Sequence, residues 1–272
     1  MNYGNTLTVN RLFETDEIKR FYENWREKPV HREWLHLWRK EFRAQLPSGG
    51  FVSLNRLRNR LNFRVLKRLC IERLPVHIYQ SALNWVSPNR VGLNHMSHGA
   101  YPYSRSEYVM DIDAYLNYQP HSHCTRKNEP CIGCIQNAYD LTVKVIDVIE
   151  ENYKDIKLVF SGRQGFHIHC FDFIVEDHTH MDAHNMVKSH EVARFQYTSQ
   201  LAEKVPEAFD KANFDLSCDP FRVMSMPESF NAVTGMSCSY LGDSKQFKRL
   251  SVDEILHMAR GPKAYMRSLN IL

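Results

Sequence analysis

The sequence predicts an α+β fold, with a helical N-terminal region packed on a domain that mixes strands with helices. Apolar residues recur at spacings of three and four over residues 11–46 and 53–73, as on the buried face of a helix. After Pro75, short strand-like runs alternate with longer helical patterns, without an internal repeat or a long linker. This order of elements favours an α+β architecture. We therefore place a boundary at Pro75, with residues 1–75 packed on a domain of residues 76–272.

Length and composition are those of an ordinary soluble globular protein. The 272 residues are 43% hydrophobic and 24% charged, which is enough to bury a sizeable core. The formal net charge of +4 is mild, so charge alone does not identify a nucleic-acid binder. The sequence contains no run of about 18 apolar residues, and its start lacks the pattern of a signal peptide. We expect no membrane association, and a location in the cytoplasm with the nucleoid, or in the nucleus of a eukaryote.

The two N-terminal helical segments are separated by Gly49-Gly50, which breaks the apolar pattern. The first segment carries apolar residues at helical spacing: Phe21, Trp25, Trp34, Leu37, Trp38 and Phe42. The second has an apolar stripe and a basic stripe, because residues four apart share a helix face. These stripes are Leu57, Leu61, Val65 and Leu69, and Arg56, Arg60, Arg64 and Arg68. The arginines form either an ordinary solvated helix face or a surface that binds nucleic-acid phosphates.

Two aspartates share one face of a predicted strand. Residues 77–85 are predicted as a strand, 86–107 as a loop, and 108–113 as a second, short strand. Because side chains alternate along a strand, Asp111 and Asp113 project to the same side and repel one another unless a cation lies between them. Mg²⁺ or Mn²⁺ is the usual ion, and two ions about 3.5–4 Å apart would activate a 3′-hydroxyl and stabilise a leaving pyrophosphate. The alternative is a strand-end turn or a lone surface pair.

A Pro-, His- and Cys-rich insertion at residues 119–135 predicts a structural zinc site. The chain has seven cysteines, and three of them fall within this insertion. In a reducing compartment such a cluster favours metal binding over disulfides. Four ligands would close a tetrahedral Zn²⁺ site: His123, Cys124, Cys131 and Cys134. His121 competes with His123, and the alternative reading is a loop with unpaired thiols.

A strand–turn–strand unit follows a helix predicted over 135–153. Its strands are residues 157–161 and 166–173, joined by the glycine-containing turn 162–165. Helical or mixed segments complete the chain. These are a helix at 183–203, a helical or irregular stretch at 204–212, loops with a short strand at 213–240, and a last helix within 251–269, which begins with a Ser251/Glu254 capping box.

The turn between these two strands is suited to binding phosphate. Gly162 lets the backbone turn sharply and expose N–H groups to an anion. Ser161 and Arg163 lie beside the turn and can donate hydrogen bonds to phosphate oxygens. His167 and His169 share a strand face, with His167 the first candidate for a phosphate contact and His169 the second. The alternative is a polar hairpin whose histidines are satisfied in the core.

The order of these motifs resembles the catalytic (small) subunit of archaeal and eukaryotic DNA primases. The three motifs are DID, then His-Cys-x6-Cys-x2-Cys, then VFSGRQGFHIH, and residues 215–235 resemble a later segment of that family. The resemblance covers residues 77–240, and the first 75 residues match nothing in the family. It implies a catalytic core on an antiparallel sheet of the RNA-recognition-motif type, with a zinc knob and added helices.

The resemblance also implies roles for individual residues. Metal binding would fall to Asp111, Asp113 and Asp215, and zinc binding to His123, Cys124, Cys131 and Cys134. Nucleotide binding would involve Ser161, Gly162, Arg163, His167, Arg222, Ser229 and Asn231. The family works with catalytic Mg²⁺ or Mn²⁺, a single-stranded DNA template and nucleoside triphosphates. It usually also has a large accessory subunit or another replication or repair protein as partner.

The chain departs from the family pattern near its predicted triphosphate site. Asn231 stands where the family has His, and Val233 where it often has Lys. The lost cation would be replaced by another base, Arg222 or Lys245. For the third carboxylate we prefer Asp215, which follows apolar Phe214 as expected at a strand end, and keep Asp219 as the reserve candidate.

Three functions remain open from the sequence. The leading prediction is a template-directed nucleotidyltransferase that starts and extends primers on single-stranded DNA by a two-metal mechanism. The second is a non-catalytic nucleic-acid-binding relative, which the changes at Asn231 and Val233 motivate. The third keeps the enzyme but gives it a repair, plasmid, viral or CRISPR-associated role.

Overall fold

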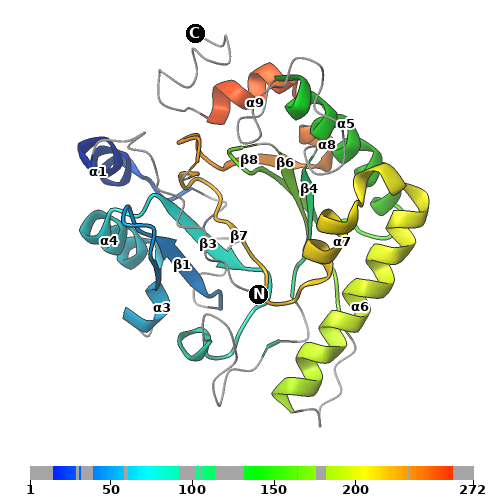
Figure 1. Ribbon diagram of the computed structural model, residues 1–272, viewed down its shortest axis with the longest axis horizontal. Coiled ribbons are helices and arrows are strands. Elements are labelled where there is room, and N and C mark those ends of the chain that lie inside the picture. The colour runs from blue at the N-terminus through cyan, green and yellow to red at the C-terminus, as the bar shows by residue number, and fades with distance from the viewer. Residues whose placement is uncertain are drawn as a thin grey trace.

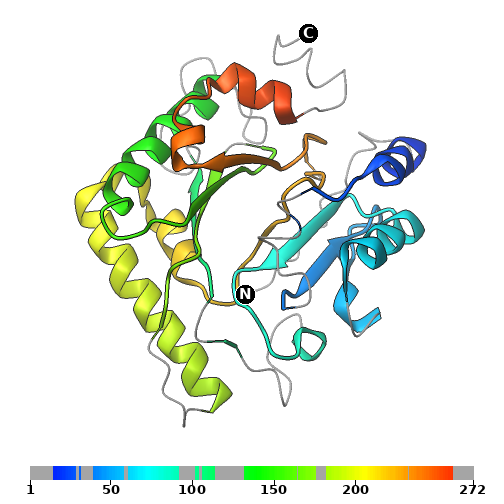
Figure 2. The same ribbon diagram turned by 180° about the vertical axis from the view of Figure 1, so that it is seen from behind.

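Two four-stranded antiparallel sheets face one another at the centre of the molecule, and helices cover their outer sides (Figures 1 and 2). The computed structural model describes residues 15–28, 31, 39–57, 61–91, 102–103, 106–113, 132–163, 165–175, 182–231 and 233–259. The first sheet has the strand order β2-β1-β3-β7, and the second sheet has the order β4-β6-β5-β8. The predicted α+β class and antiparallel sheet are therefore confirmed.

The first sheet combines N-terminal strands with a strand from late in the chain. Its strands are β1 (Phe42–Gln45), β2 (Phe51–Ser53), β3 (His77–Ser81) and β7 (Val223–Ser225). Helices α1 (Thr15–Asn24), α3 (Leu54–Leu57) and α4 (Phe63–Arg73) pack on its outer side. Their shared core includes Tyr22, Phe42 and Leu66, all of which are fully buried.

The helix predicted over residues 11–46 is wrong at its C-terminal end. Residues 42–45 form β1, which pairs with both β2 and β3. Phe42 and Ala44 are buried while Arg43 and Gln45 are half-buried, so the period here is two, not 3.6. Phe42 fits a helical spacing as well, but in the structure its side chain lies on the buried face of β1.

The single helix predicted over 53–73 is divided into two. Helix α3 ends at Leu57, and α4 begins after Asn62, whose side chain accepts a hydrogen bond from the Val65 amide. This cap satisfies a backbone N–H that a continuous helix would have paired within itself. Leu66 therefore takes the buried place predicted for Val65. The arginines predicted as one basic stripe belong to separate helices: Arg56 is on α3, Arg64 and Arg68 are exposed on α4, and Arg60 lies outside the described residues.

The second sheet and the helices that cover it enclose a larger apolar core than the first sheet does. Its strands are β4 (Tyr108–Asp113), β5 (Ile156–Phe160), β6 (Gly165–Cys170) and β8 (Ser239–Asp243). The covering helices are α5 (Ile132–Ile149), α6 (Ala183–Lys204), α7 (Lys211–Cys218), α8 (Ser244–Phe247) and α9 (Val252–Ala259). Short 3₁₀ helices span Pro88–Arg90 and Pro206–Ala208. None of the helices in the described part of the chain is long and apolar enough to cross a membrane.

Several predicted elements of this half are confirmed. Met110 and Ile112 are fully buried in the core under α5, so the aspartates between and after them point to the opposite face. The strand–turn–strand unit is β5 and β6, paired antiparallel. The capping box also forms, with the Ser251 hydroxyl and the Glu254 carboxylate each accepting from the other's backbone N–H. The stretch 213–240, predicted as loops and a short strand, instead opens with most of α7, which Asp210 caps through the Asn213 amide.

The two sheets meet through apolar contacts at two places. Val159 of β5 packs with Met226 and Cys238 in the core of the first sheet. Val109 of β4 packs against Ala82 and Met224, which lie in or next to β3 and β7. The face of β4 that carries Val109 and Asp111 therefore looks toward the first sheet.

Candidate active site

A cleft of about 170 Å³ opens between the inner faces of the two sheets. The second sheet and its turn contribute acidic, basic and hydroxyl side chains, and the first sheet contributes an arginine, a tyrosine and a serine. The described lining residues are Tyr79, Asp111, Asp113, Ser161, Arg163, His167, Arg222, Val223, Met224, Ser225 and Asn231. Seven of these are among the ten residues that the sequence predicted for the catalytic and nucleotide sites: Asp111, Asp113, Ser161, Arg163, His167, Arg222 and Asn231.

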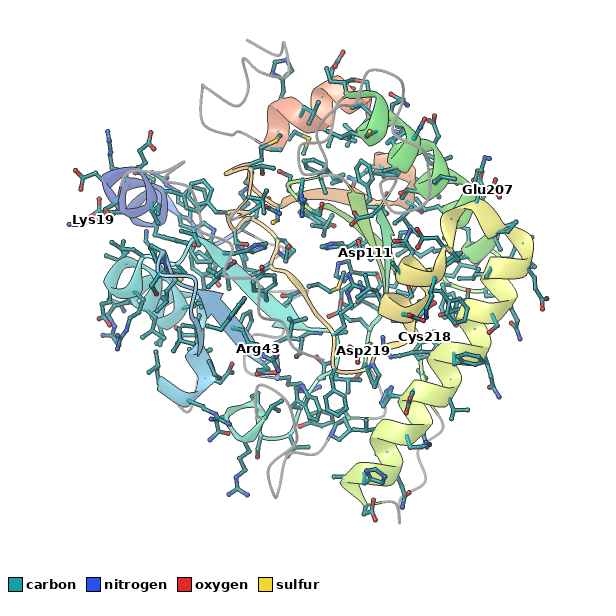
Figure 3. All side chains as sticks on the ribbon, in the orientation of Figure 1. Lys19, Arg43, Asp111, Glu207, Cys218 and Asp219 are labelled. Atoms are coloured by element: carbon teal, nitrogen blue, oxygen red, sulfur yellow. The ribbon has the colours of Figure 1, made fainter. Side chains whose placement is uncertain are left out.

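Asp111 and Asp113, two residues apart on β4, both line this cleft. Figure 3 shows Asp111 near the centre of the molecule, between the two sheets. Asp111 is only 5% exposed, and its Oδ2 forms an ion pair with Arg222 Nη2. Its other oxygen, Oδ1, is buried and has no hydrogen-bond partner among the described residues. The nearest imidazole nitrogen, His167 Nε2, is 3.6 Å from that oxygen, which is too far for a hydrogen bond. One carboxylate oxygen therefore stays available for a cation.

Gly165 lets β6 approach Asp113 closely. The two residues lie opposite each other in the β4–β6 register. A Cβ at position 165 would stand 1.8 Å from Asp113 Oδ1 and 2.6 Å from the Ile112 carbonyl oxygen. Only glycine leaves room for this carboxylate and this backbone at the same time.

The turn after β5 is fixed from both sides. The Ser161 hydroxyl accepts hydrogen bonds from the Arg163 and Gly165 amides, each at 3.3 Å. Gly162 has a φ of +75° and its carbonyl accepts a hydrogen bond from the Thr234 hydroxyl. Asn231 Nδ2 donates to the Ser161 carbonyl at 3.0 Å. Arg163 is thereby held at the mouth of the cleft.

His167 is a neutral imidazole beside Asp111. It pairs with Asp111 in the sheet register and is 4% exposed. Burial lowers the pKa of His167 to about 4, against the opposing effect of the Asp111 charge. Its Nδ1 is buried without a hydrogen-bond partner among the described residues. A neutral ring can donate one hydrogen bond and accept another, so His167 can contact a ligand in the cleft.

His169 shares the strand face of His167 but lies outside the cleft. Its Nδ1 bonds with Glu107 Oε2 at 2.7 Å, and the residue is fully buried. The ranking of His167 before His169 as a ligand contact agrees with these positions.

The predicted residues from the later segment separate into two groups. Arg222 lines the cleft, and its Nη1 is buried with no partner among the described residues, so it can receive an anion. Asn231 also lines it, but its amide is occupied in holding Ser161. Ser229 is fully buried and its hydroxyl donates to the Met226 carbonyl at 2.6 Å, outside the described lining. Lys245 is exposed on α8 and likewise lies outside that lining, so of the two predicted replacement bases only Arg222 is among the described residues of the cleft.

The third carboxylate does not join the other two. Asp215 is exposed on α7 and forms an ion pair with Lys211 at 2.8 Å. Asp219 is the C-cap residue of α7, and its Oδ1 accepts from the Phe221 amide at 2.8 Å; Figure 3 shows it at the segment that leads into β7. Neither is among the described lining residues, and the described part of the chain holds no group of three His, Cys, Asp or Glu side chains placed to bind a metal ion.

The predicted zinc ligands fall almost entirely outside the described residues. This applies to His123, Cys124 and Cys131, and to the alternative His121. Cys134 is described, and lies buried in the first turn of α5. The zinc site therefore stays a prediction.

Four residues of the cleft were not predicted from the sequence. Tyr79 is on β3, and Val223, Met224 and Ser225 make up β7. The Ser225 hydroxyl bonds with His77 Nε2 at 2.8 Å across the two strands. The alternation around Tyr79 could have indicated one face of a strand, but a sequence does not show that β3 and β7 pair.

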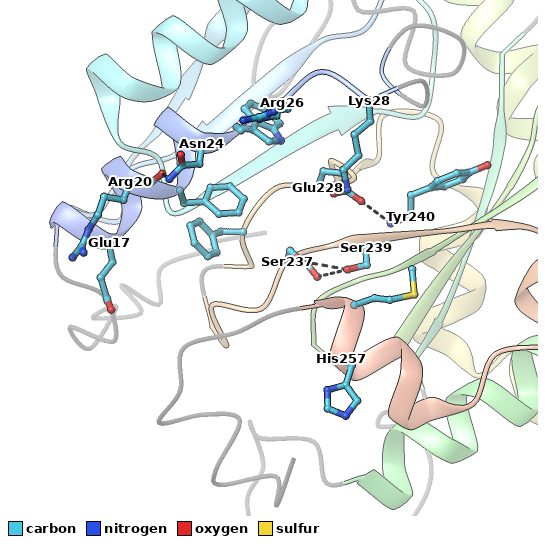
Figure 4. Close-up of a pocket in the computed structure, with 14 residues that line it drawn as sticks. Glu17, Arg20, Asn24, Arg26, Lys28, Glu228, Ser237, Ser239, Tyr240 and His257 are labelled. Carbon is cyan, nitrogen blue, oxygen red and sulfur yellow. Dashed lines mark hydrogen bonds and ion pairs between the residues drawn. The ribbon is translucent and has the colours of Figure 1, made fainter. Parts of the chain in front are cut away.

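A second groove, of about 1000 Å³, lies between α1, β8 and the end of α9 (Figure 4). Phe21 and Phe230 pack there with ring centroids 3.9 Å apart, and Lys28 forms an ion pair with Glu228. None of the residues predicted as site residues is among its described lining. The groove is therefore separate from the cleft that holds the carboxylates.

Comparisons with known proteins identify relatives of the chain. No family model matches it. The DNA primase small subunit PriS of Pyrobaculum calidifontis is 27% identical over 157 residues, or 57% of this chain and 47% of that protein. The chain resembles primase small subunits. PriS of Pyrobaculum arsenaticum is 29% identical over 155 residues (56% and 45% of the two chains), and PriS of Methanocaldococcus jannaschii 26% over 156 residues (52% and 42%).

The resemblance inferred from the motifs is thus confirmed. The chain spans about half the length of the primase small subunits it matches. A solved structure extends the likeness to the whole fold: the polymerase domain of Mycobacterium tuberculosis Ligase D, in complex with DNA, has a TM-score of 0.52, at 13% identity, over 89% of this chain and 87% of that one. At that identity the match establishes a shared fold only.

Proposed function

We propose that the chain is a template-directed nucleotidyltransferase of the primase class. The observation that carries the proposal is the cleft itself, where Asp111 and Asp113 from β4 face His167, Arg163 and Arg222. Acids that can hold cations thus lie beside bases that can hold a triphosphate. The likeness to primase small subunits supports the same reaction class.

Asp111 and Asp113 fit a catalytic Mg²⁺ or Mn²⁺. Both carboxylates enter one small cleft, and the buried Asp111 Oδ1 lacks a hydrogen bond among the described residues, which suits it to coordinate a hard cation. The bound metal would make a primer 3′-hydroxyl more nucleophilic and neutralise charge on the leaving pyrophosphate.

The other residues of the cleft would bind and orient the nucleotide. The Arg163 and Gly165 amides of the turn bond with the Ser161 hydroxyl, so the turn would act by holding the Arg163 side chain toward the phosphates. Arg163 and the unpartnered Nη1 of Arg222 would donate to phosphate oxygens. Neutral His167 would donate a hydrogen bond without adding charge next to Asp111. Catalysis would then rest on positioning and electrostatics, without a covalent intermediate.

For the third carboxylate we propose Asp219 in preference to Asp215. Asp215 is directed to solvent on α7 and already paired with Lys211. Asp219 ends that helix and precedes Arg222, which reaches Asp111. A small rearrangement of the segment between α7 and β7 would move Asp219, but not Asp215, toward the cleft.

The decisive experiment is nucleotide incorporation by the full chain. Labelled nucleotides, Mn²⁺ and a poly-pyrimidine single-stranded DNA template are supplied, with and without a primer. We expect the wild-type chain to incorporate nucleotide and Asp111→Asn to reduce the rate at least 1000-fold with an unchanged melting temperature. An equal rate in Asp111→Asn would refute the assignment of the metal site. The primer-free reaction shows whether the chain starts primers or only extends them.

A non-catalytic nucleic-acid-binding relative is the second candidate. Asn231 favours it, because its amide braces Ser161 where the family has a histidine for the nucleotide. This candidate predicts DNA binding by the wild-type chain without incorporation of either ribo- or deoxynucleotides.

The remaining predicted ligands and partners belong to this proposal as well. We propose that Cys134 joins His123, Cys124 and Cys131 around a structural Zn²⁺. We further propose that Arg56, Arg60, Arg64 and Arg68 contact template phosphates. We also propose a large accessory subunit, or another replication or repair protein, as a partner of the chain.

A further inference from the structure

A buried cluster of three ionisable side chains joins the two sheets next to the cleft. Lys40 lies two residues before β1, Glu107 directly precedes β4, and His169 lies on β6. Their exposed fractions are 1%, 2% and 0%. We call these three residues the inter-sheet cluster. None of them lines the cleft as described, so the proposed reaction has not yet used them.

The Lys40–Glu107 ion pair crosses the boundary between the sheets, and further hydrogen bonds anchor each partner within its own sheet. Lys40 Nζ donates to the carbonyls of Ser81 at 2.9 Å and Ala82 at 3.1 Å, both at the end of β3, and ion-pairs with Glu107 Oε1. Glu107 Oε2 bonds with His169 Nδ1 at 2.7 Å. The Glu107 carbonyl accepts from Arg194 Nη2 of α6 at 2.6 Å. The cluster therefore connects β1 and β3 of the first sheet with β4, β6 and α6 around the second.

The strand register places this cluster next to the site residues, on the same face of the second sheet. His169 is opposite Val109, and His167 is opposite Asp111. Opposed residues of an antiparallel pair project to the same face, so His169, Val109, His167 and Asp111 all look toward the first sheet. Going along β4 from Glu107, the order is charged cluster, then the Val109–Ala82–Met224 contact, then the Asp111–Arg222 ion pair.

The apolar contacts between β4 and the first sheet are smaller than those between β5 and the first sheet. On the β5 side, Val159 belongs to the large apolar core of the first sheet. On the β4 side, the described apolar contacts are two small clusters: one of Ala82, Val109 and Met224, and one in which Leu83, Trp85 and Val91 pack with Val187 of α6. The strand that carries both aspartates is also an edge strand of its sheet. On this side the inter-sheet cluster supplies a fully buried ionic connection between the sheets, in addition to the hydrogen bond from the Asn84 amide to the Ser106 hydroxyl and the Asp111–Arg222 ion pair.

Stability alone does not explain a buried cluster of this kind. Taking charges out of water costs about as much as their attraction returns, so apolar residues of similar size often do as well. Burial by itself raises the pKa of Glu107, but Lys40 and His169 outweigh it and hold the pKa at about 2. Burial lowers the pKa of Lys40, and the Glu107 carboxylate opposes that effect. The directional hydrogen bonds of the pair fix a position that an apolar contact would leave loose.

We propose that Lys40 and Glu107 are positioning residues: through His169 they set the spacing between the two sheets at which Asp111 and Arg222 act together on the nucleotide. This inference rests on the proposed function. Because the phosphate-binding turn belongs to the second sheet alone and Arg222 to the first, loosening the cluster affects the reacting geometry more than nucleotide binding.

The test uses the full chain with the double substitution Lys40→Met/Glu107→Leu, which replaces the pair by apolar side chains of similar size. We expect kcat for incorporation to fall at least tenfold, KM for the nucleotide to change less than threefold, and the melting temperature to stay within a few degrees. The matched control is Lys144→Met/Glu207→Leu at the surface pair, whose charged atoms are 2.7 Å apart. That control should keep the wild-type kcat.

Two further variants prevent a folding defect from hiding the answer. Glu107→Gln keeps the size and a hydrogen-bonding group but removes the charge that holds Lys40, and should also lower kcat. Lys40→Arg keeps the charge and should retain kcat within threefold of wild type. A folded double variant with wild-type kcat overturns the proposal. So does unfolding of both the double variant and Glu107→Gln, because the cluster would then hold the fold rather than set a position.

Hydrogen exchange separates this inference from the proposed function, because it needs no nucleotide. We expect amides of residues 223–225 to exchange at least tenfold faster in the double variant, with amides of α5 unchanged. Unchanged exchange at 223–225 refutes the positioning role. A wild-type chain that incorporates no nucleotide refutes the proposed function, whatever the exchange rates show.

Discussion

At the residue scale, the geometry of the cleft depends on the contacts of the Asp111 carboxylate and on the space beside Gly165. Asp111 divides its two oxygens, one in an ion pair with Arg222 and one buried without a hydrogen bond among the described residues. Gly165 leaves the space that Asp113 occupies. The sequence was enough to predict the shared face of Asp111 and Asp113 and the glycine turn, because both depend only on residues close together in the chain. From the sequence, Arg222 was only one of two candidates for a replacement base. Its contact with Asp111 could not be predicted, because the two residues are 111 positions apart.

Substituting Gly165 tests how tightly β4 and β6 must approach. Gly165→Ala adds a Cβ too close to both Asp113 Oδ1 and the Ile112 carbonyl. We expect the free energy of unfolding to fall by about 1–3 kcal/mol, the usual cost of overpacking, and incorporation to fall at least tenfold as Asp113 is displaced. Thermal unfolding and the incorporation assay measure the two effects. Gly50→Ala is the control, because the nearest atom to its Cβ would be Ser48 Oγ at 3.7 Å; equal behaviour of the two variants would contradict this account.

At the element scale, the junction between α7 and β7 decides where acidic residues point. Helix α7 carries Asp215 on its exposed face and ends at Asp219. The preference for Asp215 assumed a strand end after Phe214, but this stretch is a helix capped by Asp210. Helical periodicity turns Asp215 toward Lys211, four residues earlier, instead of toward the cleft.

Paired substitutions of these two aspartates test that reading. Asp219→Asn should lower incorporation at least 100-fold, because it removes the acid that can reach the metal side of the cleft. Asp215→Asn should stay within threefold of wild type, because it loses only an exposed ion pair. Rates measured over a range of Mn²⁺ concentrations provide the comparison. The reverse ranking would restore Asp215 as the third ligand.

The elements that the sequence predicted well are those held by local signals. Strand β4, the β5–β6 unit and the Ser251 capping box all follow from alternation, glycines or caps. The N-terminal strands were missed, because Phe42 fits both a helical and an alternating pattern and only pairing with β3 selects the strand. The pairing of β3 with β7 joins distant segments, and so Tyr79 and Ser225 escaped prediction as site residues.

At the scale of the whole molecule, several imidazoles are buried in the folded state. Burial lowers the pKa of His31 to about 4, of His77 to about 3, and of His167 and His190 to about 4. They lie in both sheets and in α6, so their protonation opposes the fold in several places at once.

This burial predicts a loss of stability in mild acid. In the unfolded chain a histidine has a pKa of about 6.5, so between pH 6.5 and 4 the unfolded state binds more protons than the folded one. Stability is therefore full above pH 6.5 and declines as the pH falls, by about 2 kcal/mol for each of these histidines by pH 5. Melting temperatures from pH 7.5 to 5 check the decline. His190→Gln should reduce its slope, because it removes one of these imidazoles; an unaltered slope would argue against it.

The first sheet takes strands from residues 42–53 as well as from 77–81 and 223–225. A polypeptide begun at residue 76 would leave β3 with an unpaired edge on one side and strip Phe42, Leu54 and Leu66 from the apolar surface under it. Exposed sheet edges of that kind invite pairing between molecules. The N-terminal segment, although it matches no primase motif, thus covers an edge of β3 that would otherwise be open to pairing between molecules.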